Sequence, residues 1–341
     1  MPQTATAPAG AHATVPLRAT ATEWFRSSGV QDASGGVTRY YRGDARLPNS
    51  VEITAYAVQG MLQIGLKEQA LKAGRFILQA WNPALRAFPF ELEGSQLSYF
   101  FDTGIVARAL VALWRETGED SWLTAAVCAG DSMIDHFMAA DGYHPILSLP
   151  SRQPLRHELW WSKNPGCFQL KAALAWRELA ELTGEARFEH HYRRQLEFSI
   201  DTAASLIDVE TERLRVMDRL HPYCYFLEGL LPVADEAGPL LEHGIALVGQ
   251  LWRELAPQFL RSDVLAQLLR VRLISGVPID HAAAREEAEL LETFATHKGA
   301  FLFGRRAGEP IPHRNPVSTV FAFQALDWYR SGRAGSWREL I

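Results

Sequence analysis

The segment Ala112-Leu113-Trp114-Arg115-Glu116-Thr117-Gly118-Glu119 recurs in kind further along the chain, as Glu178-Leu179-Ala180-Glu181-Leu182-Thr183-Gly184-Glu185. In both copies an apolar helical stretch ends at a glycine, and an acidic residue opens the stretch that follows. Gly65 ends an earlier stretch in the same way. The repeat predicts units of two helices joined by a tight turn. Such a unit cannot bury its apolar face alone, so the units must associate laterally.

Short turns inside these units alternate with long connections between them. The expected helix pairs are 51–65 with 67–81, 101–117 with 120–138, 166–183 with 185–205, 221–235 with 239–256, 263–276 with 282–295, and 315–331 with 16–28. The long connections cover 82–100, 139–165, 206–220 and 296–314. This alternation places the long connections on one face, where functional loops usually lie. The irregular spacing favours a closed ring, so we predict an all-α (α/α)6 toroid, a six-hairpin barrel with short β-hairpins in the long loops.

Composition indicates one large domain. The chain has 341 residues, of which 48% are hydrophobic and 21% charged, and no linker divides it. We expect a single domain over 16–331, a disordered tail over 1–15 and a C-terminal tail over 332–341. The net charge of −5, with acids and bases interleaved, gives no nucleic-acid footprint. No long apolar run predicts a membrane span, and the Ala/Thr/Pro-rich start is not a signal peptide. Three widely spaced cysteines give no disulfide framework, so the expected location is the cytoplasm.

The predicted first helices of the pairs begin with similar residues. These starts are Ser50 before Glu52, then Asp102, Asn164-Pro165, His221-Pro222 and Asn315-Pro316. Proline suits the first helical position, and Ser, Asp and Asn are good N-caps. Capping alone is therefore the alternative explanation of Asp102, Asn164 and Asn315. His221 is a poor cap, and its alternative role is structural. In a closed ring these starts converge on one end of the axis, where positive helix ends surround a cavity.

This cavity is the predicted site. Glu52 and Tyr56 share a helix face, as do His221 and Tyr225. Aromatic rings stack on the C–H faces of sugars while polar groups take the hydroxyls. The catalytic candidates are His221, Asp102, Glu52 and Tyr225, and the substrate-binding candidates are Tyr56, Tyr99, Trp160, Trp161, Asn315 and Arg314. The alternative for Trp160 and Trp161 is that they only pack their loop onto the barrel.

Several of these residues lie in motifs that resemble a known family. Gly35-Gly36-Val37-Thr38-Arg39-Tyr40-Tyr41, followed by Val51-Glu52-Ile53-Thr54-Ala55-Tyr56, resembles the opening of bacterial helical-barrel proteins of the six-hairpin type. Phe101-Asp102-Thr103-Gly104 is similar to their F-D-T-G, His221 to Leu231 to their H-T-x-x-Y-x-x-x-G-L-L, and Asn315 to their P-N-W segment. The likeness runs from Gly35 to Tyr329. Ala55, Ile105 and Pro222 depart from the pattern.

The resemblance implies a six-hairpin toroid among carbohydrate-active proteins. This superfamily includes glycosidases, unsaturated-uronyl hydrolases, N-acylglucosamine 2-epimerases and the helical domain of glucuronyl C5-epimerases. The most similar relatives are often encoded with polysaccharide-biosynthesis genes. The motif positions that carry over are Glu52, Tyr56, Asp102, His221 and Tyr225, and Pro222 in place of threonine puts a hydroxyl role beside His221 in doubt.

Two kinds of acid–base chemistry stay open at this point. A glycosidase needs two carboxyl groups, for which the candidates are Asp102, Glu52 and Glu228. An epimerase or lyase needs a base and a cation, for which they are His221, Tyr225, His313 and Arg314. A non-catalytic glycan-binding or scaffold role in polysaccharide biosynthesis is the other alternative. Cys167 and Cys224 lack the sequence context of zinc-binding toroids, and there is no phosphate loop. We therefore expect a saccharide ligand, no metal and no cofactor.

Overall fold

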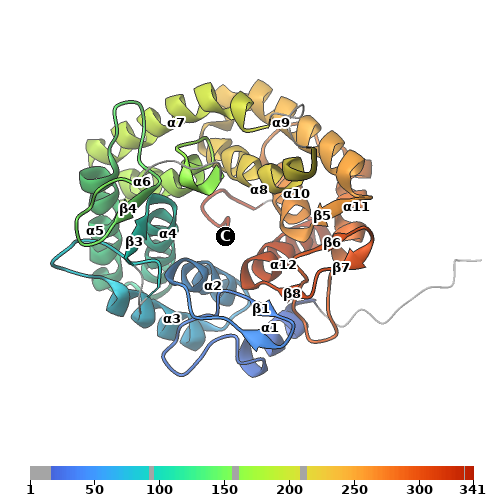
Figure 1. Ribbon diagram of the computed structural model, residues 1–341, viewed down its shortest axis with the longest axis horizontal. Helices are drawn as coiled ribbons and strands as arrows, with labels where there is room; N and C mark the ends of the chain where they lie inside the picture. Colours follow the sequence, from blue (N-terminus) through green and yellow to red (C-terminus); the bar gives the residue numbers. More distant parts are fainter. Residues whose placement is uncertain (1–16, 92–95, 156–160, 208–212, 334) are drawn as a thin grey trace, which may run out of the picture.

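The computed structural model describes residues 17–91, 96–155, 161–207, 213–333 and 335–341. The inner ring consists of α2 (Val51–Gln63), α4 (Phe100–Thr117), α6 (Gln169–Thr183), α8 (Arg213–Leu230), α10 (Ser262–Ile274) and α12 (Pro316–Ser331). Each of these contacts the next, and α12 contacts α2, which closes the ring (Figure 1). The outer helices are α1 (Leu17–Ser27), α3 (Lys67–Ala80), α5 (Asp120–Phe137), α7 (Ala186–Leu206), α9 (Ala234–Leu255) and α11 (His281–Glu292). The predicted (α/α)6 toroid is confirmed.

The repeated Thr-Gly-Glu segment forms the same turn in both copies. Gly118 and Gly184 end their helices at a φ of 72°, a left-handed conformation that glycine adopts without a Cβ clash. The hydroxyls of Thr117 and Thr183 each donate to the carbonyl four residues earlier at 2.8 Å. Local chemistry therefore sets the tight turn inside each hairpin.

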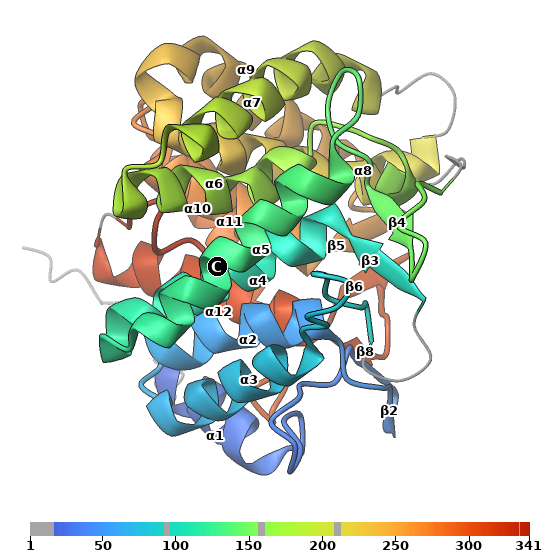
Figure 2. The ribbon, with the colours of Figure 1, turned by 90° about the vertical axis from the view of Figure 1, so that its left-hand side faces the viewer.

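Short antiparallel strands lie in the connections between the helix pairs. They form the sheet β2-β1-β8 (Ala45–Arg46, Tyr41–Arg42, His313–Arg314), the pair β3-β4 (Leu97–Tyr99, Ile146–Ser148) and the sheet β5-β6-β7 (Phe259–Arg261, Gly304–Arg306, Glu309–Pro310). Figure 2 shows that they lie at one end of the barrel, beside the first turns of the inner helices. The expected short hairpins are present, and so is a collection of loops at one mouth.

Three helix starts differ from expectation, including that of α9, which begins at Ala234 rather than at 239. Helix α8 begins at Arg213, so Pro222 lies inside it and His221 is not at a helix end. Proline breaks one intrahelical hydrogen bond, but Val216 and Leu220 on the preceding turns are fully buried, and this packing holds the helix together across the proline. Helix α6 begins at Gln169, which leaves Asn164 and Pro165 in the preceding loop.

The C-terminal segment 335–341 ends inside the domain, although Arg338 and Glu339 are exposed. It enters the barrel axis from the end where the inner helices stop, and the chain ends at the centre of the ring (Figure 1). Leu340 and Ile341 are buried. The ring leaves an axial space, which the side chains of Leu340 and Ile341 fill.

Charged side chains on the inner helices hold this segment. Glu228 pairs with Arg270 at 2.5 Å and with Lys171 at 3.0 Å, and all three side chains are fully buried. Lys171 Nζ and Arg270 Nη1 also donate to the Ile341 carbonyl oxygen at 3.0 and 3.1 Å. We name Lys171, Glu228 and Arg270 the axial belt. Buried charges of this kind are tolerated because they are paired.

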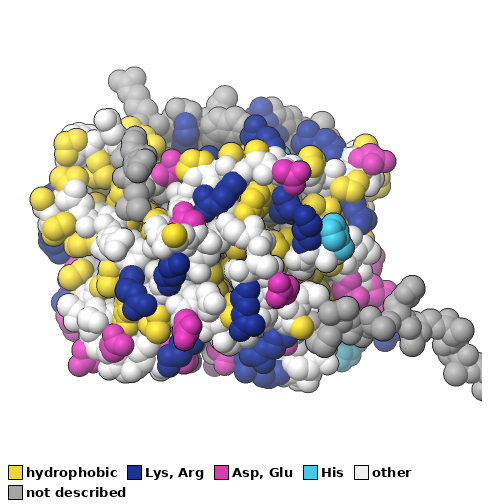
Figure 3. All heavy atoms as spheres, turned by 90° about the horizontal axis from the view of Figure 1, so that it is seen from below, with side chains coloured by type: hydrophobic (Ala, Val, Ile, Leu, Met, Phe, Trp, Pro, Cys, Tyr) yellow, Lys and Arg dark blue, Asp and Glu magenta, His cyan; other side chains and the backbone are white. Residues whose placement is uncertain are grey.

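On the face drawn in Figure 3, basic and acidic side chains are interspersed among apolar ones. In the part of the chain that the structure describes, no helix has both the length and the apolar character needed to cross a membrane. The expected N-terminal tail, 1–15, lies outside the described residues.

Candidate functional site

A cavity of about 280 Å³ opens at the strand-bearing end of the barrel, between the first turns of α2, α4 and α6 and the middle of α8. Six of the residues predicted from the sequence line it: Glu52, Tyr99, Asp102, Trp161, His221 and Tyr225. They come from α2, β3, α4, the short helix η1 (Trp161–Lys163) and α8. The ring thus brings together residues that lie up to 173 positions apart in the sequence (225 − 52).

Two carboxyl groups occupy the cavity. Burial raises the pKa of Glu52 to about 7. Burial, and then the negative charge of Glu52, raise the pKa of Asp102 well above its usual range. Neither carboxyl forms an ion pair with a described residue, and Asp102 Oδ2 is buried without a hydrogen-bond partner. Since two nearby carboxylates resist ionising together, the pair holds a proton near neutral pH. Asp102 is not the N-cap residue of α4, since that position belongs to Tyr99, whose side chain makes no capping hydrogen bond.

His221 presents a neutral imidazole to the same space. Its Nδ1 lies 2.6 Å from Gln267 Oε1, and an amide oxygen can only accept, so Nδ1 carries the proton and Nε2 keeps its lone pair. Burial lowers the pKa of His221 to about 4, although Asp263, 3.7 Å away, acts to raise it. Arg261 chelates Asp263 at 2.7 and 2.9 Å. Burial keeps His221 neutral, and no helix end contributes, because His221 lies inside α8 rather than at the start that the sequence predicted.

Aromatic rings form much of the cavity wall. Trp161 packs edge-on against Phe168, with ring centroids 5.1 Å apart, and its ring lies 6.3 Å from that of His221. The ring centroids of Phe101 and Tyr225 lie 4.8 Å apart. Rings in this arrangement offer apolar faces beside the two carboxyl groups, which suits a sugar ring.

Tyr56 does not line the cavity but lies next to it. It is buried, and its hydroxyl donates to the Tyr225 hydroxyl at 3.2 Å. Burial and the neighbouring Tyr225 raise its pKa well above the usual value, so the phenol stays neutral.

Of the predicted binding residues, two lie away from the cavity and a third is not among the described residues. Asn315 caps α12, with its Oδ1 accepting from the Val317 N–H at 2.8 Å. Arg314 donates to the Gly43 carbonyl at 2.7 Å, pairs with Asp44 and lines a different hollow. Pairing of β8 with β1 draws Arg314 to that turn and away from the cavity. Trp160 lies outside the described residues.

Sequence reasoning missed several residues of the site. Phe90, Phe168 and Gln169 line the cavity, and Gln267 holds His221 from α10. A usable signal existed for Gln267, which lies one turn after Asp263 at an expected helix start. Among the other chemical candidates, Glu228 belongs to the axial belt, and the described residues contain no group of three potential metal ligands.

Comparison with known proteins reveals the fold in solved structures. No family model and no curated protein sequence matches the chain. A cellobiose 2-epimerase from Spirochaeta thermophila matches with a TM-score of 0.62 at 14% identity, over 94% of this chain and 100% of that one. A sugar epimerase from a ruminal bacterium matches with 0.67 at 12% identity, over 94% and 99%.

An inactive variant of an α-1,6-mannanase from Salegentibacter, in complex with α-1,6-mannotriose, matches with a TM-score of 0.61 at 11% identity, over 91% of this chain and 98% of that one. At such identities these likenesses show the fold alone. The expected likeness to six-hairpin sugar-processing enzymes is confirmed at that level.

Proposed function

We propose that this protein is a carbohydrate-active enzyme that hydrolyses a glycosidic bond, with Glu52 and Asp102 as its acid–base pair. One observation carries the proposal: two carboxyl groups with raised pKa values share an aromatic-lined cavity without a cation beside them. Glycosidases require one carboxyl that keeps its proton and a second that ionises. That the epimerase and mannanase structures share this fold is consistent with a saccharide substrate.

The two carboxyl groups take different roles in this mechanism. Asp102, whose pKa is raised by both burial and Glu52, keeps the proton and donates it to the leaving glycosidic oxygen. Glu52, with a pKa of about 7, ionises first and either activates water or attacks the anomeric carbon. His221 Nε2 accepts a hydroxyl proton of the sugar and orients the ring, and Tyr99 and Trp161 contact its faces.

Epimerisation or elimination is the second candidate, and it rests on His221. A neutral imidazole, held by Gln267 with Nε2 unprotonated, can remove a proton from carbon next to a carbonyl or carboxylate. In that case the carboxyl pair would carry the proton to the other face of the sugar. We also propose, from the sequence motifs, that the protein acts in the cytoplasm in a polysaccharide-biosynthesis system and without nucleic acid or cofactor.

The two chemistries give different NMR signatures. The wild-type protein is incubated in D2O with a panel of neutral and acidic oligosaccharides. Hydrolysis creates new reducing-end anomeric signals, whereas epimerisation replaces a ring proton by deuterium. Glu52→Gln and Asp102→Asn should each abolish the hydrolytic signal. Wild-type turnover in both variants would refute the assignment, and binding without turnover by any panel member would favour a glycan-binding protein.

A further inference from the structure

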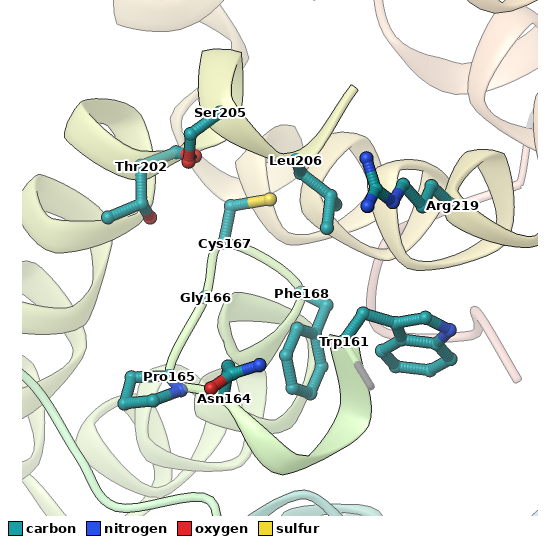
Figure 4. A pocket seen from close by; sticks show the side chains of 10 residues that line it. All are labelled: Trp161, Asn164, Pro165, Gly166, Cys167, Phe168, Thr202, Ser205, Leu206 and Arg219. Carbon is teal, nitrogen blue, oxygen red and sulfur yellow. The ribbon is translucent and has the colours of Figure 1, made fainter. Parts of the chain in front are cut away.

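A second hollow lies directly beside the cavity. It has a volume of about 260 Å³, and Trp161 and Phe168 belong to the walls of both spaces. The other walls come from the loop before α6, the end of α7 and the middle of α8. Figure 4 shows Arg219 and Leu206 on one side of this hollow, with Trp161 and Phe168 opposite. The two spaces are of nearly equal size and share an aromatic wall.

Arg219 is the distinctive residue of the hollow. It is half-buried, its guanidinium points toward the hollow, and it forms no ion pair or hydrogen bond with any part of the described chain (Figure 4). The buried arginines behave differently, since Arg108, Arg261 and Arg270 each pair with a carboxylate. A guanidinium has five donors that match the geometry of an oxyanion, and no residue of the described chain takes any of those of Arg219.

The opposite end of the hollow provides acceptors. Thr202 donates its hydroxyl proton to the Phe198 carbonyl at 2.8 Å, and Ser205 donates to the Thr202 carbonyl at 2.8 Å. With both protons engaged inside α7, the two hydroxyl oxygens keep free lone pairs for a ligand hydroxyl. A cation that has no partner among the described residues, two hydroxyl acceptors and an indole together suit a molecule with an oxyanion, hydroxyl groups and an apolar face.

We infer that this hollow, which we call the Arg219 subsite, binds a sugar unit that carries an oxyanion. Its source is either a carboxylate or a sulfate ester. The inference rests on the proposed function and extends it to the substrate class. Electrostatics determines which sugar unit of the substrate lies in which of the two spaces. The first cavity contains Glu52 and Asp102 and repels an anion, so a neutral ring occupies it. The acidic neighbour lies across Trp161, against Arg219. The substrate is therefore an acidic oligosaccharide.

Binding to the wild-type protein is measured by titration calorimetry with four small probes: glucose, glucuronate, glucose 6-sulfate and inorganic sulfate. None needs turnover, so the result is independent of the proposed chemistry. Arg219→Gln should weaken glucuronate, glucose 6-sulfate or both by roughly 10- to 100-fold, the range for hydrogen bonds to a charged group. Affinity for glucose should not change. Thr202→Val should weaken the acidic sugar several-fold. Arg75→Gln removes the same charge from an exposed position on α3 and should have no effect.

Each outcome decides something. Loss of glucuronate alone identifies a carboxylate, and loss of glucose 6-sulfate alone identifies a sulfate ester. Unchanged affinity in Arg219→Gln, an equal loss of glucose affinity, or no binding of either acidic sugar to the wild type would each overturn the proposal. The proposal would also be refuted if inorganic sulfate bound as tightly as the sulfated sugar and Thr202→Val had no effect. The hollow would then bind an ion and not a sugar. Turnover that survives in Asp102→Asn would refute the hydrolytic mechanism without changing these affinities.

Discussion

The hydroxyl of Tyr56 donates to the hydroxyl of Tyr225 at 3.2 Å, across 169 residues of sequence. Tyr56 belongs to α2 and Tyr225 to α8, which lie on opposite sides of the inner ring (Figure 1). The pair therefore crosses the axis. Tyr225 contributes to the cavity, while Glu228, one turn along the same helix, belongs to the axial belt. The two phenols thus form a partition between a carboxyl-bearing cavity and a paired, charged interior.

Removing this hydrogen bond should have a modest effect on stability. Tyr56→Phe and Tyr225→Phe should each lower the free energy of unfolding by about 1 kcal/mol, and the double variant should cost less than the sum of the two. The reason is that both single changes delete the same bond. Urea denaturation of the four proteins measures this coupling. Strictly additive losses would show that the two hydroxyls do not interact.

Glu52→Gln should abolish turnover and yet stabilise the protein at neutral pH. The folded-state pKa of Glu52 is raised to about 7, so between pH 4.5 and 7 the folded state holds a proton that the unfolded state has lost. The contribution of Glu52 to stability therefore falls as pH rises through this window. Glutamine removes the penalty, which we expect to be on the order of 1–2 kcal/mol because part of the side chain meets the cavity.

Melting curves of the wild type and Glu52→Gln at pH 5 and pH 7.5 check this prediction. The variant should melt a few degrees higher at pH 7.5 and nearly equal to wild type at pH 5. His221 is present in both proteins, so its own titration cancels. Glu289→Gln, an exposed change on α11, serves as control and should leave both melting temperature and activity unchanged. A variant that is less stable than wild type at pH 7.5 would mean that Glu52 has a stabilising partner.

Gln267→Glu should raise the pKa of His221. A carboxylate in place of the amide, 2.6 Å from Nδ1, favours the imidazolium and opposes the burial that now lowers this pKa to about 4. The pKa of His221, measured by NMR titration of its ring protons, should rise toward the ordinary value near 6.5. If His221 acts as a base, the acid limb of the pH profile of kcat/KM should move to higher pH by the same number of pH units. Gln267→Met, which removes the acceptor without adding charge, should not produce an upward shift.

Glu228→Gln should destabilise the protein strongly. It leaves Lys171 and Arg270 buried without their shared carboxylate, and breaking a buried pair of this kind costs about 3–5 kcal/mol. Adding Lys171→Met should recover part of the loss, since one uncompensated cation is removed. Guanidinium denaturation measures both proteins. A single variant as stable as wild type would show that the Ile341 carbonyl and Gln324 alone satisfy the two cations.

Much of the fold could be predicted from the sequence because its causes are local. Apolar periodicity identified the helices to within a few residues for most of them, and Gly118 and Gly184 mark turns that only a left-handed residue completes. Alternation of short and long connections then implied the closed ring. Helix α8 was the exception, since packing of its first turns let it continue through Pro222.

Only part of the candidate site could be predicted from the sequence. Glu52 and Asp102 stand in the first turns of neighbouring inner helices, so their convergence follows from the ring. Their raised pKa values do not, because burial is a property of the assembled barrel. Asn315 stands at a helix start like Asp102, but its side chain accepts from the Val317 N–H of α12. Arg314, predicted as a cation of the site, is held by the turn after β1 instead.

The sequence by itself determined the helices and their tight turns, since each depends on residues a few positions apart. The closed ring was predicted from the alternation of short and long connections. Only the tertiary structure decided the contacts between distant parts of the chain. These include the bond between Tyr56 and Tyr225, the hold of Gln267 on His221 and the insertion of Ile341 into the axial belt. These contacts depend on which side chains face one another across the assembled ring. The conformational preferences of residues near each other in the sequence do not determine them.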